Sequence, residues 1–348
     1  MRVLIATVQV PFVRGGAEIL AEGLRDAIQG VGHEAEIVAI PYKGYPPERI
    51  LDQLLACRLL DLTESAGNPV DLLLGLKFPA YLIPHPNKVL WIVHQHRAAY
   101  ELWDHPLGDF MHYPNGPHVR DAIRQAEERL IAEARAVFTI SANVAHRLKQ
   151  YCGIEAEPLY HPPRYAEQFY CATADDYFFF PSRLSPLKRQ TLVLEALALT
   201  RHPVHVRFAG VPEHPTYAEA FRASVRRLGL DDRVSWLGYL TEEEKRYHYA
   251  HALGVIFPPH DEDYGYVTLE AMLASKPVIT CTDSGGPLEF VRAGETGLTT
   301  EPTPQAIAAA LDALWESRNW ARRMGESGRA YYLSLRISWE SAVQRLLG

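Results

Sequence analysis

Two glutamates in the second half of the chain, Glu262 and Glu270, are separated by seven residues. A carboxylate can accept hydrogen bonds from both hydroxyls of a vicinal diol, and sugars present such diols. Glu270 lies in the first turn of a predicted helix, where residues 265–267 offer free backbone N–H groups beside it. The alternatives are a first-turn glutamate favoured by the helix dipole and, for the acidic triplet 261–263, a solvated loop or a carboxylate metal site.

A cationic pair, Arg183 and Lys188, follows a predicted strand and precedes a predicted helix. Two fixed cations there could neutralise a diphosphate, Arg through a bidentate fork and Lys as a point charge, although a solvated basic loop is the alternative. In the first half, Gly15 and Gly16 also lie between a strand and a helix, where backbone N–H groups can approach an anion. Their spacing is not that of the dinucleotide fingerprint, and a tight turn is the alternative.

Two consecutive series of strand and helix patterns must position these residues. The first series predicts strands at 3–8, 36–40, 72–74, 89–93 and 137–140, and helices at 17–29, 47–60, 120–134 and 142–151. After a turn-rich linker at 161–176, the second predicts strands at 177–180, 204–208, 234–237, 254–257 and 277–280, and helices at 190–199, 217–228, 241–250, 267–274, 304–315 and 318–335. Two such series indicate two parallel-sheet α/β domains, which bind ligands at the carboxyl ends of their strands.

The composition fits two folded domains and excludes several classes of protein. The chain has 348 residues, and 35 Lys+Arg against 42 Asp+Glu give a net charge of −7, which argues against a nucleic-acid binder. The four cysteines form no C-x-x-C pair, so a zinc ribbon is absent and a reducing compartment is expected. No apolar run approaches 18 residues and no signal-peptide pattern opens the chain, so a cytoplasmic protein is expected.

Further motifs follow in the second half: Leu-Glu-Ala-Met at 269–272, Lys-Pro-Val-Ile at 276–279, Asp-Ser-Gly-Gly-Pro at 283–287 with Glu289, and Gly-Glu-Thr-Gly-Leu at 294–298. With the features above, this order resembles glycosyltransferase family 4 (glycosyl transferases group 1), retaining enzymes of the GT-B fold. The resemblance covers nearly the full length and is more specific in the second half. It implies an α/β fold of two Rossmann-like parallel-sheet domains facing across a cleft. The expected domains are an acceptor-side domain at 1–163, a donor domain at 164–331, and a C-terminal helix at 332–348 that packs back on the first domain.

The resemblance also implies a role for each matching residue. Arg183 and Lys188 are expected to bind the donor diphosphate, Glu262 the transferred sugar, and Glu270 the ribose diol. The catalytic set is His94, Arg183, Lys188 and Glu262. The remaining donor-binding residues approach the base, the sugar or the phosphates: Gly15, Gly16, Tyr239, Leu240, Tyr264, Gly265, Tyr266 and Val267. Two positions depart from the family pattern, Ser275 in place of glycine and Tyr264 in place of phenylalanine.

A histidine of the family lines the sugar site after the strand predicted at 89–93. His94 aligns best with it, and His96 is the alternative. His96, Arg97, Tyr100 and Trp103 are acceptor-side candidates, with the two aromatic rings as surfaces on which a sugar could stack. Core packing is the alternative for both rings. A metal site built from His94, His96 and a further histidine has no known spacing, so no metal or other cofactor is expected.

The sequence therefore predicts a retaining, metal-independent glycosyltransferase that moves a sugar from a UDP-, GDP- or ADP-linked donor to a glycan or lipid-linked acceptor. Its expected place is the biosynthesis of glycans, lipopolysaccharide or glycolipids. The alternatives are another GT-B enzyme, an epimerase or phosphorylase, and a non-catalytic two-lobed sugar-binding protein. A cytoplasmic protein is expected, with or without a peripheral membrane contact. The base, the sugar, the acceptor and the oligomeric state stay open.

Overall fold

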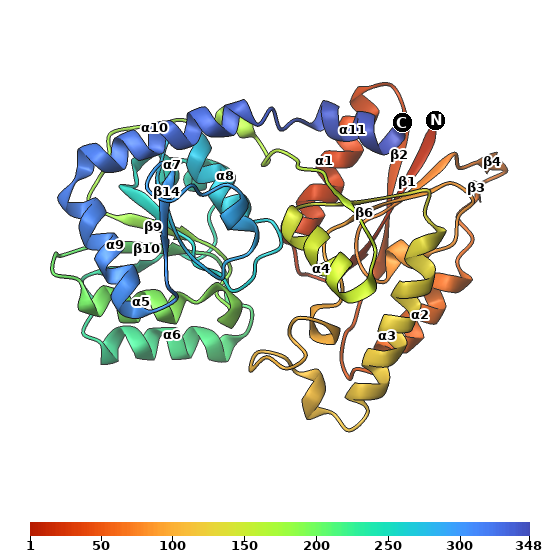
Figure 1. Cartoon of the computed structure of the whole chain (residues 1–348), viewed down its shortest axis with the longest axis horizontal. Helices are drawn as coiled ribbons and strands as arrows, with labels where there is room; N and C mark the ends of the chain where they lie inside the picture. Colours follow the sequence, from red (N-terminus) through yellow and green to blue (C-terminus); the bar gives the residue numbers. More distant parts are fainter. The chain divides into compact units, whose positions relative to one another are not determined.

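The computed structural model describes all 348 residues, Met1–Gly348, and the chain divides into two compact units (Figure 1). Unit 1 comprises residues 1–164 and 338–348, and unit 2 comprises residues 165–337. Each unit is built on a six-stranded sheet in which every strand pair is parallel. The predicted class of two Rossmann-like parallel-sheet α/β domains is confirmed.

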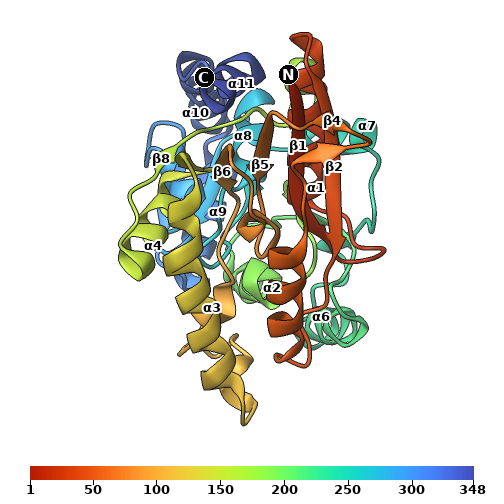
Figure 2. The ribbon, with the colours of Figure 1, turned by 90° about the vertical axis from the view of Figure 1, so that its right-hand side faces the viewer.

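The sheet of unit 1 has the strand order β2-β1-β5-β6-β7-β8. Its strands are β1 (Arg2–Gln9), β2 (Glu34–Pro41), β5 (Leu72–Gly75), β6 (Lys88–Ile92), β7 (Ala136–Thr139) and β8 (Glu157–Pro158). Figure 2 shows β1, β2, β5 and β6 side by side. Every residue of β5 and β6 is buried, as expected for central strands covered on both faces. The helices of the unit are α1 (Gly16–Gly30), α2 (Arg49–Leu59), α3 (Gly116–Leu130), α4 (Ala142–Cys152) and α11 (Trp339–Leu347).

The sheet of unit 2 has the strand order β11-β10-β9-β12-β13-β14. Its strands are β9 (Phe178–Pro181), β10 (Val206–Ala209), β11 (Val234–Trp236), β12 (Gly254–Ile256), β13 (Val278–Cys281) and β14 (Gly297–Thr300). Its helices are α5 (Gln190–Leu199), α6 (Pro215–Arg227), α7 (Glu242–His251), α8 (Tyr266–Leu273), α9 (Pro304–Glu316) and α10 (Arg318–Ser334). None of the helices in the chain has the length and hydropathy of a membrane span.

The predicted elements agree with the structure where the apolar pattern is long. Helix α5 has the predicted bounds, and the Ser141 hydroxyl caps α4 by accepting from the backbone N–H of Val144 at 3.1 Å. Helix α3 begins four residues earlier than predicted, with Pro117 in its first turn. Several short elements were not predicted, because two to four residues carry too little periodicity: β8, β14 and the hairpin of β3 (Glu64–Ser65) and β4 (Asn68–Pro69).

The C-terminal segment expected to return to the first domain is shorter than predicted. Helix α10 ends at Ser334, and residues 332–337 belong to unit 2. A new helix, α11, starts after Ser338 and packs on α1 within unit 1. The indole of Trp339 lies against the rings of Trp91 and His161, with centroid separations of 6.2 and 5.7 Å. The bend at 337–339 therefore separates two helices that belong to different units.

Packing of α11 on α1 depends on a glycine inside α1. A Cβ atom on Gly23 would overlap the indole ring of Trp339. We expect Gly23→Ala to lower the free energy of unfolding by about 1–3 kcal/mol, because overpacking outweighs the better helix propensity of alanine. Urea unfolding followed by tryptophan fluorescence measures this change. Gly30→Ala is the matched control, since nothing lies within 4 Å of its added Cβ atom. Equal stability of the two variants would contradict the packing argument.

Candidate functional site

The sheet of unit 2 has a topological switch point between β9 and β12. The chain leaves β9 for β10 on one side and later places β12 on the other side. Loops that follow the two central strands therefore diverge, and open α/β sheets bind ligands in the crevice outside these carboxyl ends. Arg183 and Lys188 lie in the loop after β9, and Glu262 lies in the loop after β12. The structure thus brings three of the predicted residues to one edge of one sheet.

Lys188 and Glu262 contact each other directly. The Lys188 Nζ donates to Glu262 Oε2, and both side chains are about four-fifths shielded from solvent. The ammonium also lies 5.5 Å from the centroid of the Phe257 ring. Arg183 is half-exposed on the same loop, with its guanidinium 3.8 Å from Glu213 Oε1. A diphosphate at this edge would meet one partly buried lysine and one more exposed arginine.

Glu270 is held from two directions, and its side chain is nearly buried, with 6% of the residue exposed. Its Oε1 accepts from Lys245 Nζ at 2.9 Å, and its Oε2 accepts from the Tyr249 hydroxyl at 2.7 Å. Lys245 also pairs with Glu242 at 2.9 Å. Burial lowers the pKa of Lys245, but the charges of Glu270 and Glu242 outweigh it and raise that pKa. Lys245 and Tyr249 were not among the predicted site residues, although their spacing of four residues puts them on one face of α7.

The turn before α8 requires two glycines. Gly265 has φ of 85°, and a Cβ atom there would approach Pro287 Cγ at 2.9 Å. A Cβ atom on Gly286 would approach the carbonyl oxygen of Tyr264 at 2.7 Å. The two glycine-containing motifs therefore pack against each other. The backbone N–H groups of Tyr266 and Val267 lie at the amino-terminal end of α8, where the helix dipole favours anions.

The remaining predicted residues of unit 2 differ in exposure. Tyr264 is 3% exposed and packs edge-on against the rings of Tyr266 and Phe290. Its ring therefore belongs to the packed turn. Tyr239 is 77% exposed after β11, next to Gly238 with φ of 68° and the half-buried Leu240. An exposed aromatic ring of this kind can stack on a planar base.

The acceptor-side residues predicted after β6 do not share one environment. His94 is half-buried, and its Nδ1 lies 2.7 Å from the carbonyl oxygen of Gln95. The His96 ring lies against Phe78 and Phe110, with centroid separations of 5.4 and 5.0 Å. Burial lowers the pKa of His96 to about 4, so this ring is neutral at pH 7. Both residues are half-buried, and the contacts with Phe78 and Phe110 favour a packing role for His96.

Tyr100 corrects the sequence analysis. It is 4% exposed, and its hydroxyl donates to Glu127, so its ring cannot stack on an acceptor. Trp103 is half-buried, and the Arg120 guanidinium lies 4.3 Å from its ring centroid. Arg97 donates from Nε to Glu101 Oε1 at 2.6 Å. Of the two aromatic candidates, only Trp103 retains an exposed surface.

The Gly15-Gly16 turn already holds a carboxylate. The backbone N–H of Gly15 donates to Glu18 Oε2 at 2.7 Å, and Lys77 Nζ lies 3.7 Å from Glu18 Oε1. The N–H group of Gly15 is therefore satisfied within unit 1. A phosphate would have to displace the Glu18 side chain to reach this group.

A buried carboxyl fixes the loop after β6. Glu127, on α3, is fully buried and accepts from the hydroxyls of Tyr81 and Tyr100 and from Gln95 Nε2 at 3.2 Å. Burial raises the pKa of Glu127 to about 7, although these three donors oppose the rise. Cys152 completes the cluster, with its Sγ 3.1 Å from Gln95 Nε2. No sequence motif indicates this cluster, because its members lie far apart along the chain.

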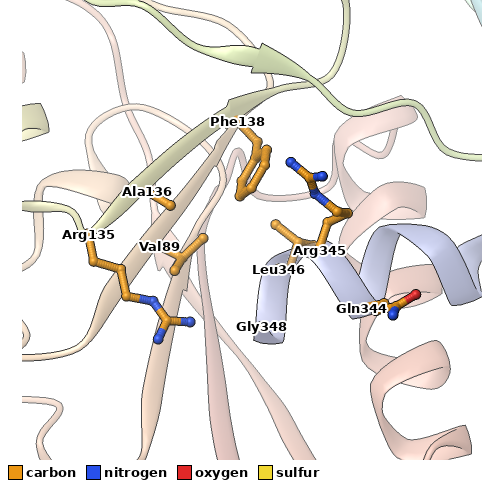
Figure 3. Close-up of a pocket in the computed structure, with 8 residues that line it drawn as sticks. All are labelled: Val89, Arg135, Ala136, Phe138, Gln344, Arg345, Leu346 and Gly348. Carbon is orange, nitrogen blue, oxygen red and sulfur yellow. The ribbon is translucent and has the colours of Figure 1, made fainter.

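An open pocket of unit 1 lies at the amino ends of β6 and β7 (Figure 3). Its lining residues are Val89, Arg135, Ala136, Phe138, Gln344, Arg345, Leu346 and Gly348. Arg345 pairs with Glu157, and Arg135 donates to the carbonyl oxygen of Leu347 at 3.3 Å. Both cations thus serve contacts inside the unit, and the pocket contains none of the predicted site residues.

The fold is that of the GT-B glycosyltransferases. Residues 167–331 match the family model described as glycosyl transferases group 1. The match confirms the resemblance that the motifs of the second half indicate.

Individual relatives agree with this class. The chain is 32% identical over 120 residues to the α-1,3/1,6-mannosyltransferase ALG2 of Dictyostelium discoideum, covering 34% of this chain and 28% of ALG2. It is 25% identical over 254 residues to the O-antigen chain mannosyltransferase C of Escherichia coli, covering 64% of this chain and 67% of that protein. The structure of Anabaena Alr3699/HepE in complex with UDP and glucose superimposes with a TM-score of 0.72 at 18% identity. That superposition covers 100% of this chain and 98% of the other.

The raised pKa of Glu127 makes stability depend on pH. Between about pH 4.5 and 7 the folded state holds this proton and the unfolded state has lost it, so stability falls as the pH rises through this window. We expect wild type to lose about 2–4 kcal/mol across it relative to Glu127→Gln, which has no such ionisation. Urea unfolding at pH 5, 6, 7 and 8 measures the slope. Glu128→Gln, at the exposed neighbouring position, should keep the wild-type slope; parallel slopes for all three proteins would refute the assignment.

Proposed function

We propose that the chain is a retaining glycosyltransferase that binds a nucleoside diphosphate sugar at the switch point of unit 2. The observation that carries this proposal is the fixed carboxylate of Glu270, in the second turn of α8, held by Lys245 and Tyr249. Each of its oxygens retains a lone pair after these bonds, so both can accept from a ribose diol. Lys188 and Glu262 lie at the same edge of the sheet, where the phosphates and the sugar would follow.

The charges at this edge suit a departing diphosphate. Arg183 and Lys188 supply two positive charges that would stabilise the negative charge developing on the leaving group. Glu262 would accept hydrogen bonds from hydroxyls of the transferred sugar while it keeps the Lys188 ammonium in place. The backbone N–H groups of Gly265, Tyr266 and Val267 would bind anionic oxygens at the start of α8. In unit 1, we assign the sugar-site role to His94, which aligns best with the histidine of the family, and leave His96, whose ring lies against Phe110, to packing.

The substrates are proposed from chemistry and from the relatives. A neighbour of the same fold binds UDP and glucose, and two relatives are mannosyltransferases, one of them acting on O-antigen chains. These names support a hexose donor linked to UDP, GDP or ADP and a glycan or lipid-linked acceptor bound on unit 1. We include retention of configuration at the anomeric carbon in the proposal because the family that the sequence resembles consists of retaining enzymes. The predicted cytoplasmic location and a peripheral membrane contact stay predictions.

Loss of the ribose contact should act on nucleotide affinity. We expect Glu270→Ala to weaken binding of the preferred nucleoside diphosphate by about 10–100-fold, because a hydrogen bond to a charged group is lost. Isothermal titration with UDP, GDP and ADP measures the affinity. Wild type should bind the 2′-deoxy form of the preferred nucleotide more weakly than the ribo form. Glu270→Ala should bind the two forms with the same affinity.

Controls for this prediction come from two other glutamates. Glu243→Ala, at an exposed position on α7, should leave nucleotide affinity unchanged. Glu262→Ala should retain nucleotide affinity and lose turnover of the donor sugar, because contacts to the transferred sugar strengthen in the transition state. Unchanged nucleotide affinity in Glu270→Ala would remove the basis of the proposed ribose site.

Catalysis is expected to need no divalent metal. Arg183 and Lys188 would neutralise the diphosphate, and Glu262 in the acidic triplet already pairs with Lys188. Donor turnover should therefore survive exhaustive EDTA treatment and fall by about 100–1000-fold in Lys188→Ala. Activity that is lost with EDTA and restored by Mn²⁺ or Mg²⁺ would overturn this expectation and favour a metal at the acidic triplet, residues 261–263.

A further inference from the structure

Arg189 adopts a backbone conformation that disfavours its own side chain. It has φ of 60° and ψ of 37°, at the junction between the turn that ends at Lys188 and the start of α5. An L-residue with a Cβ atom pays an energetic penalty in this left-handed region, and glycine adopts it freely. A non-glycine residue persists in such a conformation when its surroundings hold it there, and these positions often serve function.

The guanidinium of Arg189 makes the contacts that could hold it. Its Nη1 and Nη2 donate to the two carboxylate oxygens of Asp283 at 2.7 and 2.6 Å, a bidentate ion pair. Nη2 also lies 3.0 Å from His260 Nδ1. The three side chains are about one-fifth to one-third exposed. Burial would raise the pKa of Asp283, but hydrogen bonding and the charge of Arg189 outweigh it and lower that pKa. We refer to Arg189, Asp283 and His260 as the Arg189 clamp.

The Arg189 clamp joins three loops at the carboxyl edge of the sheet. Arg189 ends the loop after β9, His260 lies in the loop after β12, and Asp283 lies in the loop after β13. Backbone hydrogen bonds connect the same loops. The N–H of His260 donates to Leu187 O at 2.8 Å, that of Asp261 to Asp283 O at 2.8 Å, and that of Glu262 to Ser284 O at 2.9 Å. The ion pair therefore closes a network that already aligns the loops.

Lys188 and Glu262 each lie close in sequence to a member of the clamp. Lys188 precedes Arg189, and Glu262 follows His260 by two residues. Fixing Arg189 against Asp283 therefore fixes the direction in which the Lys188 side chain leaves the backbone. The contact between Lys188 Nζ and Glu262 therefore joins two residues whose backbone neighbours, Arg189 and His260, are held together by the clamp. A bidentate guanidinium defines such an alignment better than a single ammonium group would.

We propose that Arg189 is a positioning residue that holds Lys188 and Glu262 in register for the diphosphate of the donor. This inference rests on the proposed function and extends it to a residue that touches no substrate. It accounts for an arginine where the backbone favours glycine. It also predicts a selective effect: binding of the terminal phosphate, which we assign to Lys188, should depend on the clamp, and binding of the nucleoside with its first phosphate should not.

The test compares nucleoside diphosphates with monophosphates. UDP, GDP, ADP and the matching monophosphates are titrated calorimetrically into wild type, Arg189→Gly, Arg189→Lys and Asp283→Asn. We expect Arg189→Gly to weaken diphosphate binding by about tenfold or more while monophosphate binding stays within about twofold. Arg189→Gly should fold, because glycine favours the observed φ. Arg189→Lys keeps the charge but loses the bidentate pair, so it should show the same selective loss.

Two controls separate positioning from a general effect on structure. Arg336→Gly makes the same substitution at another left-handed position of unit 2, exposed and with φ of 51°, and should leave both affinities unchanged. Asp283→Asn should reproduce the loss of Arg189→Gly, and the double variant should lose little more, since both remove one interaction. Melting temperatures of all variants identify any that fail to fold. If Arg189→Gly fails to fold, Arg189→Lys takes its place in the comparison.

The outcomes distinguish the clamp from the proposed function. A selective loss of diphosphate affinity in the Arg189 and Asp283 variants supports the clamp. Unchanged affinities, or an equal loss for monophosphate and diphosphate, would overturn the clamp and leave the proposed function standing. If wild type bound none of the six nucleotides, the proposed function and the clamp would both fall.

Discussion

A nearly buried carboxylate needs donors for both of its oxygens, and the packing of α7 against α8 meets this need at Glu270. Lys245 and Tyr249 reach it from successive turns of α7, so the carboxylate keeps one orientation. Removing one partner from such a group leaves an uncompensated charge, which costs more than the bond itself contributes. The edge of unit 2 that we assign to the donor therefore has a fixed carboxylate in the absence of any ligand. At Glu262, one carboxylate oxygen, Oε2, accepts from Lys188 Nζ.

The buried carboxyl of unit 1, Glu127, has donors of a different kind. Glu127 accepts from two phenols and an amide, with no cation among these donors, and burial shifts its pKa toward neutrality. Phenol and amide donors stabilise an ion less than an ammonium group does. Both units are built on a six-stranded parallel sheet, and they differ in how firmly they fix a negative charge. Permanent charges line the edge of unit 2 that we assign to the donor, whereas the loop after β6 is anchored on a group that can take up a proton.

Much of this arrangement could be predicted from the sequence. The alternation of strand and helix patterns gave both sheets, because buried strands and amphipathic helices have different periods. The spacing of Glu262 and Glu270 and the cationic pair placed these side chains at one edge, since parallel strands end there together. Partners such as Lys245, Arg189 and Glu127 could not be predicted, because their contacts depend on which helix faces and loops meet. Tyr100 was assigned wrongly for the same reason: its aromatic type suggested a stacking surface, and its hydroxyl instead bonds to a glutamate 27 residues later.

The division of unit 1 between the two ends of the chain has a consequence for synthesis. Residues 1–164 leave the ribosome first, yet α11 reaches unit 1 only after all of unit 2 has been made. At about 5–20 residues per second, unit 1 waits for its last helix while the 173 residues from 165 to 337 are translated. During that interval the surface that Trp339 later covers, beside Trp91 and His161, has no partner from its own chain. The first unit to begin folding is therefore the last to be completed.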